Sequence, residues 1–212
     1  MKDKLDIAMA LDRAGIDIIE AGNPAANPKD AESFKELLAL PLTHAKLAAF
    51  TRTCVKGRSA EEDPGLQATL KSGVGIVAIV GKSDSRQVEH VLGADRAENL
   101  RMIRDSVKFF TSKGVKVIFD AEHYFDGYKY DKEHSLAVVR EAFAAGADTV
   151  ALCDTNGGTY PSAIYDITCE TVQACDGKIG IHCHNDIGCA VAGSMASVEA
   201  GAVQIQGTFV GF

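Results

Sequence analysis

One local pattern recurs along the chain: a helix-like stretch, a glycine, and then a short run rich in valine and isoleucine. It occurs five times, in DRAGIDIIEAG, LKSGVGIVAIVGK, TSKGVKVIFDAE, AFAAGADTVALCDT and VEAGAVQIQGT. A glycine directly after a helix is typical of a left-handed C-terminal cap. The Val/Ile-rich run that follows indicates a strand buried on both faces. Two further runs, PLTHAKLAAFT and DGKIGIHCHN, fit the same pattern with other turn residues.

The spacing of these units restricts the fold. The turns fall near residues 15, 42, 73, 114, 146, 177 and 201, at intervals that βα units occupy. Alternating helices and strands predict a parallel sheet, either closed as a barrel or open and doubly wound. An open dinucleotide-binding sheet usually carries a GxGxxG turn, and neither this motif nor GxxxxGK[ST] occurs here. An α/β fold of the (β/α)8 TIM-barrel class is therefore favoured.

The barrel is expected to be incomplete. Seven strands are readable where a TIM barrel needs eight, and the chain begins on a helix and ends on a strand. We therefore expect residues 1–212 to form a single, partial catalytic barrel domain that lacks the first strand and the last helix.

Composition excludes several classes of protein. A formal net charge of −7 argues against a nucleic-acid-binding surface, which needs clustered Lys and Arg. No apolar run is long enough to span a membrane, and the start MKDKLDIAMALDRAG predicts an amphipathic helix rather than a signal peptide. The six cysteines form no CxxC pair, which favours buried, reduced thiols. We expect a cytoplasmic protein.

Polar residues gather where the predicted strands end, which is where TIM barrels carry their chemistry. An unpaired polar group buried there would cost about 2–7 kcal/mol, so such residues need partners or ligands. The polar strand-end residues are Glu20, Asn23, Thr51, Arg52, Thr53, Lys82, Asp120, Glu122, His123, Asp154, Thr155, Asn156, His182, His184, Asn185 and Asp186.

The strand-end segment GIHCHND carries two histidines. His182 and His184 are two residues apart, so in a strand their side chains point to the same face about 7 Å apart. Two imidazoles placed in this way can bind one metal ion, each with its second ring nitrogen held by a neighbour. The alternative is a hydrogen-bonded pair of core histidines; we favour metal ligands, although two ligands alone are too few for a catalytic metal.

Other strand ends supply candidates for catalysis and substrate binding. Glu122 could act as an acid, a base or a substrate-orienting group, or it could form a salt bridge across the barrel mouth. Thr155, before the Gly157-Gly158 pair, could donate a hydrogen bond to a substrate carboxylate, or it could belong to an ordinary turn. Asn23, after the first strand, is a second candidate for substrate binding.

These segments together resemble the DRE-TIM metallolyase superfamily, and within it the branch of the (R)-citramalate and 2-isopropylmalate synthases. The resemblance extends over essentially the whole chain. It is carried by IEAGNPAANPKD, SAEEDPGLQATL, FDAEHYFDGYK, LCDTNGGT and GIHCHNDIGCAVAGSMASVEAGAVQIQGTFVGF. The HxH and the DAEHYFDGYK segments are its most specific parts.

The resemblance implies a reaction and a ligand set. It implies a Claisen condensation of acetyl-CoA, as co-substrate, with an α-keto acid, most simply pyruvate, in isoleucine or leucine biosynthesis. A divalent Mg, Mn or Zn ion would be bound by His182 and His184, with Glu122 as an acid, a base or an orienting group and Thr155 on the keto-acid carboxylate. Further ligands, an Asp and an Asn, belong to a DTTLRDG-like strand and a GERCGN-like loop that the sequence lacks.

Two alternatives stay open at this point. One is a metal-dependent C–C lyase or aldolase of the same superfamily, similar to HMG-CoA lyase or 4-hydroxy-2-oxovalerate aldolase. The other is an inactive fragment with a vestigial site, because the missing ligands predict weak metal affinity and little synthase activity for residues 1–212 alone. Exposed barrel edges favour self-association, and we expect a homodimer.

Overall fold

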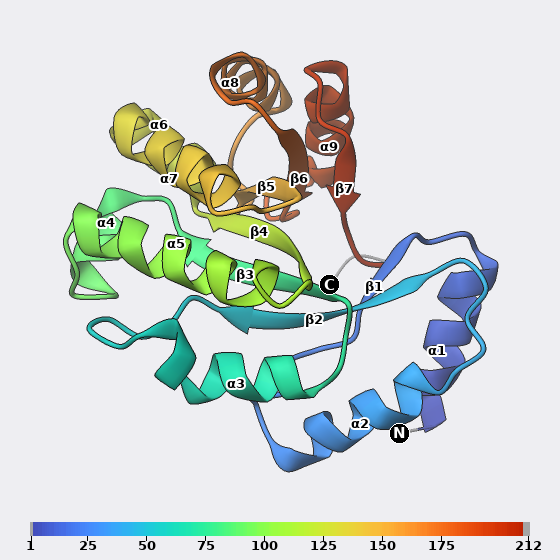
Figure 1. The fold of residues 1–212 in the computed structure, drawn as a ribbon. Coiled ribbons are helices and arrows are strands. Elements are labelled where there is room, and N and C mark those ends of the chain that lie inside the picture. Colours follow the sequence, from blue (N-terminus) through green and yellow to red (C-terminus); the bar gives the residue numbers. More distant parts are fainter. Residues whose placement is uncertain (1, 210–212) are drawn as a thin grey trace.

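A seven-stranded parallel sheet forms the centre of the molecule (Figure 1). The computed structural model describes residues 2–209, apart from the side chains of residues 28 and 29. Met1 and residues 210–212, the end of the GTFVGF segment, lie outside the described residues. The strands pair in chain order: β1 (Ile18–Glu20), β2 (Lys46–Arg52), β3 (Ile76–Lys82), β4 (Lys116–Glu122), β5 (Thr149–Asp154), β6 (Lys178–Cys183) and β7 (Gln204–Gln206).

Helices cover the outer, convex face of this curved sheet (Figure 1). They are α1 (Lys2–Arg13), α2 (Pro28–Leu38), the 3-10 turn η1 (Ala60–Glu62), α3 (Pro64–Lys71), α4 (Ser85–His90), α5 (Arg96–Thr111), α6 (Tyr124–Tyr130), α7 (Lys132–Ala144), α8 (Pro161–Ala174) and α9 (Ala190–Glu199). The predicted fold class is confirmed: the seven strands form part of a (β/α)8 barrel.

The glycines of the repeated pattern adopt the backbone conformation that the sequence predicts. The five glycines that follow helices in the repeated pattern have φ angles between 76° and 109°, in the left-handed region that favours glycine. Each such turn ends a helix and starts the next strand, so the regular spacing of the glycines produces the regular order of the sheet. These glycines are Gly15, Gly73, Gly114, Gly146 and Gly201.

Alternation along each strand separates two kinds of environment. On β4, Val117 and Phe119 point outward into the main apolar core, which the strands share with the helices. Ile118 points inward and packs with Ala48 and Ile76 in a small apolar layer inside the curved sheet. Asp120 and Glu122 follow on the same inward face of β4, and Lys82 ends that face of β3, so the inner face carries polar side chains at the carboxyl end of these strands.

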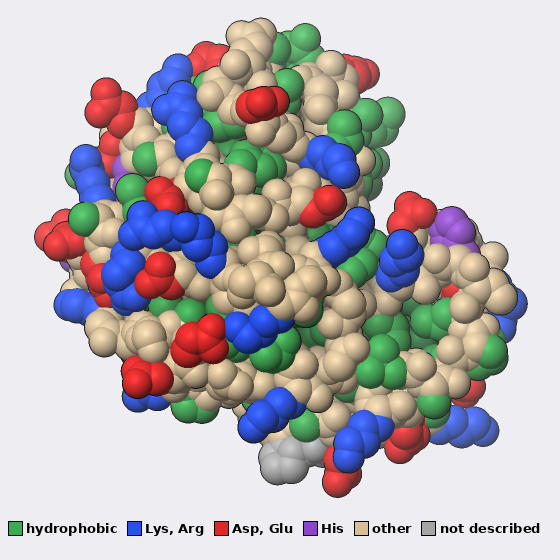
Figure 2. Space-filling view, viewed as in Figure 1, with side chains coloured by type: hydrophobic (Ala, Val, Ile, Leu, Met, Phe, Trp, Pro, Cys, Tyr) green, Lys and Arg blue, Asp and Glu red, His purple; other side chains and the backbone are tan. Residues whose placement is uncertain are grey.

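The sheet is open between its first and last strands. No pairing joins β1 to β7 within residues 2–209, and the surface is indented between the lobe of α9 and β7 and the lobe of α1 (Figure 2). Apolar side chains are exposed beside this opening, including Val191 and Met195 on α9, Val203 just before β7 and Ile205 on β7. In the part of the chain that the structure describes, no helix is both long and apolar enough to cross a membrane.

Candidate functional site

The predicted site residues that lie on strands share the inner face of the sheet near its carboxyl end. Side chains alternate between the two faces along a strand. Asp120 and Glu122 on β4 therefore point inward like Ile118, and Lys82 on β3 points inward like Ile76. On β6, Ile179 and Ile181 pack into the outer core, so His182 lies on the inner face. Five of the polar strand-end residues are thereby placed on one inner surface: Glu20, Lys82, Asp120, Glu122 and His182.

The two histidines of GIHCHND lie against each other. Their ring centroids are 5.1 Å apart with an interplanar angle of 29°. His182 Nδ1 lies 2.8 Å from the Oε1 atom of Gln206, which is its direct register partner on β7. The ring of His184 has no hydrogen bond to any residue that the structure describes. The sequence prediction that a neighbour holds the second ring nitrogen therefore applies to His182 and not to His184.

Gln206 also contacts a buried carboxylate. Its Nε2 atom donates a hydrogen bond of 2.7 Å to Asp120 Oδ1 on β4. Asp120 is only 5% exposed, and this burial raises the pKa of its carboxyl group to about 6, while the hydrogen bond from Gln206 opposes the rise. Loss of hydration also raises the pKa of Glu20, and repulsion from the Asp120 charge raises it further. The side chain of Glu20 is in contact with solvent, which weakens both effects.

The sequence prediction missed Gln206. One signal was available: Gln204 and Gln206 alternate with Ile205 in a strand-like run, which places two amides on one face. The partner of such an amide is not encoded locally, because Gln206 and Asp120 are 86 residues apart in sequence.

Glu122 forms an ion pair with Lys82, its register partner on β3, at 2.6 Å between Nζ and Oε2. Both side chains are largely buried, at 16% and 26% exposure for Lys82 and Glu122. The salt bridge considered as an alternative for Glu122 is therefore present. It does not exclude an acid–base role, because the carboxylate still lies at the inner rim of the sheet.

Thr155 supports the turn that follows Glu122. The backbone N–H of His123 donates a 2.8 Å hydrogen bond to Thr155 Oγ1. His123 has φ 58°, and it is the only residue other than glycine with a positive φ in the described chain. This left-handed conformation is uncommon outside glycine. It directs the ring back toward Glu122, with 3.9 Å between His123 Nε2 and Glu122 Oε1.

Asn23 lies apart from these groups. Its side-chain oxygen accepts a 2.9 Å hydrogen bond from the backbone N–H of Ala25, which is a local turn after β1. No hydrogen bond or ion pair found within residues 2–209 joins Asn23 to Glu122 or to the two histidines. A substrate contact by Asn23 stays a prediction.

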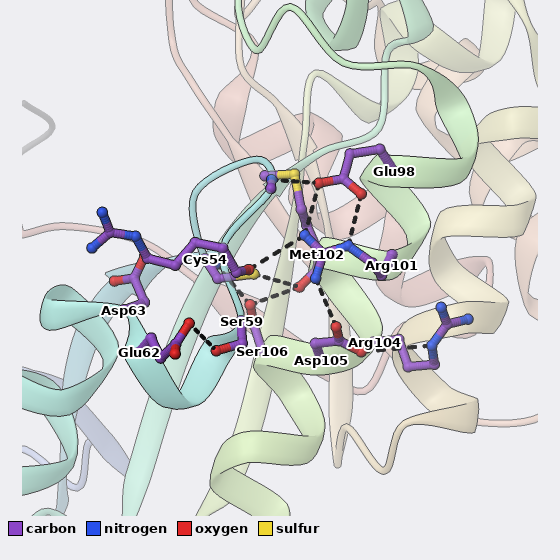
Figure 3. Close-up of polar contacts among 12 residues, drawn as sticks. Cys54, Ser59, Glu62, Asp63, Glu98, Arg101, Met102, Arg104, Asp105 and Ser106 are labelled. Carbon is purple, nitrogen blue, oxygen red and sulfur yellow. Dashed lines mark hydrogen bonds and ion pairs between the residues drawn. The ribbon is translucent and has the colours of Figure 1, made fainter.

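The loop after β2 is held firmly at the same end of the sheet (Figure 3). The Cys54 N–H donates to Ser106 Oγ at 2.8 Å, and the Gly57 N–H donates at 2.8 Å to Glu98 Oε1 on α5, where Arg101 pairs with Glu98 at 2.7 Å. Asp63 is fully buried and accepts from the Val55 N–H at 3.0 Å.

The charged run RSAEEDP predicts a solvated helix start, and Asp63 does begin a helix, but it is buried rather than solvated. Its carboxylate caps α3 through the N–H groups of Gly65 and Leu66, and these bonds compensate for its loss of hydration.

The two histidines could supply some, but not all, of the ligands that a divalent cation needs. His182 has Nδ1 occupied by Gln206 and Nε2 available, and imidazole suits Zn and related transition-metal ions. Among residues 2–209, no group of three or more His, Cys, Asp and Glu side chains is placed to bind a metal ion together. The described residues thus supply two candidate ligands.

The fold and the polar strand ends define an incomplete (β/α)8 barrel with a candidate active site at the carboxyl ends of its strands. The HMGL-like family matches residues 1–212, and the chain belongs to this family. The resemblance to the DRE-TIM superfamily is thereby confirmed.

Several synthases are similar over the whole chain. The identity is 46% over 211 residues to the (R)-citramalate synthase of Sulfolobus acidocaldarius and 44% over 220 residues to that of Synechocystis, covering 100% of this chain and 40% of each relative. A probable 2-isopropylmalate synthase from Methanopyrus kandleri is 35% identical, with the same coverage. The chain thus spans about 40% of the length of these curated relatives.

Solved structures share the fold at lower identity. Hydroxymethylglutaryl-CoA lyase from Pseudomonas aeruginosa has a TM-score of 0.77 at 24% identity, covering 96% of this chain and 68% of that one. The carboxyl transferase domain of Rhizobium etli pyruvate carboxylase has a TM-score of 0.66 at 18% identity, covering 95% and 36%.

Proposed function

We propose that the protein is an acyltransferase of the citramalate and 2-isopropylmalate synthase type. It would condense acetyl-CoA with an α-keto acid, pyruvate in the simplest case, and release citramalate and free CoA after thioester hydrolysis. The observation that carries this proposal is the 46% identity to an (R)-citramalate synthase over the full chain. The inner surface that contains Glu122, His182 and His184 supports it.

A divalent metal, Mg, Mn or Zn, would be held by His182 and His184. Such an ion acts as a Lewis acid that polarises a keto group for attack. The ring of His184 is free of protein hydrogen bonds among the described residues, and the ring of His182 is held through Nδ1 only. Both imidazoles are therefore available as ligands at the inner surface.

Glu122 and Lys82 provide a proton-transfer group and a positive charge. The ammonium group of Lys82 lies 2.6 Å from the Glu122 side chain, and a carboxylate in this position could accept a proton from a carbon acid. The same ammonium group lies at the rim where negative charge would develop on the acetyl group.

Thr155 keeps a donor available. Its oxygen accepts the His123 N–H, and a hydroxyl can donate its own proton at the same time. The Thr155 O–H would therefore bind the carboxylate of the keto acid, while its oxygen holds the turn after Glu122. Asn23 would contribute from the β1 end of the site.

In the cell, this reaction would belong to branched-chain amino-acid biosynthesis, leading to isoleucine or leucine, in the cytoplasm. The exposed apolar residues of α9 and β7 support self-association as a homodimer. Analytical ultracentrifugation of the protein tests this assembly: a dimer is expected, and a monomer at all concentrations would contradict it.

The function is tested by an assay of the protein produced from its complete reading frame. Acetyl-CoA is incubated with pyruvate, with a longer α-keto acid, or with neither, and free CoA and the product mass are measured. We expect CoA release that depends on the keto acid and is abolished by a chelator. Cleavage of a hydroxyacyl-CoA without condensation would instead indicate a lyase, and would refute the proposal.

A further inference from the structure

We infer that Gln206 is a positioning residue that fixes the ring tautomer of His182, with Asp120 fixing the orientation of the Gln206 amide. The three side chains form a chain of hydrogen bonds from β4 through β7 to β6: carboxylate, amide, imidazole. The inference rests on the proposed function in one respect, the assignment of His182 as a metal ligand.

The carboxylate decides which way the amide points. A carboxylate only accepts hydrogen bonds, whereas an amide has a donating NH2 end and an accepting oxygen end. At 2.7 Å from Asp120 Oδ1, the NH2 end is the stable neighbour, since the oxygen end would place two acceptors in contact. The oxygen of Gln206 therefore faces His182.

The amide oxygen in turn decides where the ring proton lies. Gln206 Oε1 is 2.8 Å from His182 Nδ1 and can only accept, so Nδ1 carries the proton. A neutral imidazole has one N–H, so Nε2 is left with its lone pair. This nitrogen is the one that remains free to bind a metal ion.

The neighbouring amide on the same strand shows that the arrangement is specific. Gln204 shares the inner face of β7 with Gln206 because the two are two positions apart, with Ile205 between them. Yet Gln204 Oε1 is a buried atom without a hydrogen-bond partner in the described chain. An amide on this face does not find a partner automatically, and only Gln206 meets both a carboxylate and an imidazole.

The test measures the tautomer directly by long-range 1H–15N NMR of the metal-free protein in mildly alkaline buffer. Histidine free in water favours the Nε2–H form, so the expected Nδ1–H form of His182 is the opposite of the default. A His182→Gln variant assigns the resonances.

Three variants isolate the chain of hydrogen bonds. Gln206→Leu removes the acceptor and should return His182 toward the Nε2–H form. Asp120→Asn should give a mixture of tautomers, because an Asn side chain can donate as well as accept. Gln204→Leu, on the same face of the same strand, should leave the spectrum unchanged. The inference is overturned if wild-type His182 shows the Nε2–H form, or if Gln206→Leu keeps the Nδ1–H form.

A metal titration adds the second readout. Loss of a group that orients a metal-bound histidine typically weakens metal affinity about 10–100-fold. In calorimetric Zn²⁺ titrations of the protein from its complete reading frame, we expect this loss for Gln206→Leu and none for Gln204→Leu. Zn²⁺ binding that leaves the His182 resonances unshifted would contradict the metal site of the proposed function, while the tautomer result would still decide the role of Gln206.

Discussion

The Glu122 part and the histidine part of the site differ in how their side chains are held. Glu122 and Lys82 come from β4 and β3, strands with neighbours on both sides, and they pair with each other at 2.6 Å. His182 depends on one amide from β7, a three-residue edge strand with Ile205 55% exposed. The ring of His184 stacks on His182 and forms no hydrogen bond or ion pair with the described residues.

The difference indicates a division of roles. The Glu122 part is pre-organised by main-chain pairing, by the Thr155 hydrogen bond and by helices that cover the outer face. In the histidine part, His182 Nε2 and the ring of His184 have no hydrogen bonds to described residues, as the proposed metal ligands require, and His182 is oriented through Gln206 and Asp120. Substitutions should therefore affect folding mainly on the central strands, and metal binding mainly beside β6 and β7.

The largest expected effect is on turnover. Glu122→Gln removes an ionisable group at the inner rim and should lower kcat by about 100–10,000-fold, as loss of a general acid or base does. The measurement is keto-acid-dependent CoA release. Glu133→Gln, on the exposed first turn of α7, is the control and should have wild-type activity. Normal turnover in Glu122→Gln would exclude an acid–base role.

The second prediction compares two helix caps: Asp63, the buried cap of α3, and Asn27, the exposed cap of α2. Asp63→Ala near the central strands should lower the free energy of unfolding by about 1–3 kcal/mol, because it leaves buried N–H groups without an acceptor. Asn27→Ala, which removes the exposed cap of α2 near edge strand β1, should cost about 1 kcal/mol or less. Urea unfolding measures both free energies. Equal losses of stability in the two variants would contradict the predicted difference between the buried and the exposed cap.

The third prediction concerns the ion pair itself. Lys82→Met should lower the free energy of unfolding by about 1–2 kcal/mol, between the values for exposed and fully buried pairs, because both side chains are partly accessible. Lys132→Met, which breaks the exposed pair with Glu170, is the matched control and should cost less. Urea unfolding measures both losses of stability. A larger loss for Lys132→Met than for Lys82→Met would contradict the prediction and would show that the Lys82–Glu122 pair is more hydrated than its exposure indicates.

The smallest effect depends on pH and tests the anchoring of α1. Backbone N–H groups of Ala45, His44 and Thr43 hold the pKa of Asp12 well below its usual range. A lowered pKa means that the contribution of Asp12 is present above the unfolded-state pKa, about 3.9, and is lost as the pH falls. Asp12→Asn should thus destabilise the protein at neutral pH and reduce the slope of stability against pH in acid.

The control for Asp12 is Asp17, whose side chain is 88% exposed beside His44. Thermal unfolding across a pH series should show almost no change for Asp17→Asn. An acid slope that is the same in wild type and Asp12→Asn would contradict the account of Asp12.

The fold could be predicted from the sequence because its signals are local. Gly73 and Gly146 end helices in the left-handed conformation, and the runs after them form strands β3 and β5 where expected. The inward direction of His182 and Glu122 also follows from strand alternation.

Other features of the site depend on contacts between distant segments. The link from Gln206 to Asp120 joins residues 86 apart, and no local pattern specifies it. The burial of Asp63 was not predicted because a carboxylate in a charged run reads as solvated until its N–H partners are known. The left-handed His123 depends in the same way on Thr155, which comes from the next strand end.

The central claim is that the Glu122 part and the histidine part form one active site. The most direct test is a crystal structure of the protein from its complete reading frame with Mn²⁺ or Zn²⁺ and pyruvate. The account predicts an anomalous peak bonded to His182 Nε2 and to His184, with the pyruvate carboxylate on Thr155 and its methyl group on the side of Glu122. A metal bound elsewhere, or a keto acid that contacts neither Thr155 nor the metal, would contradict it.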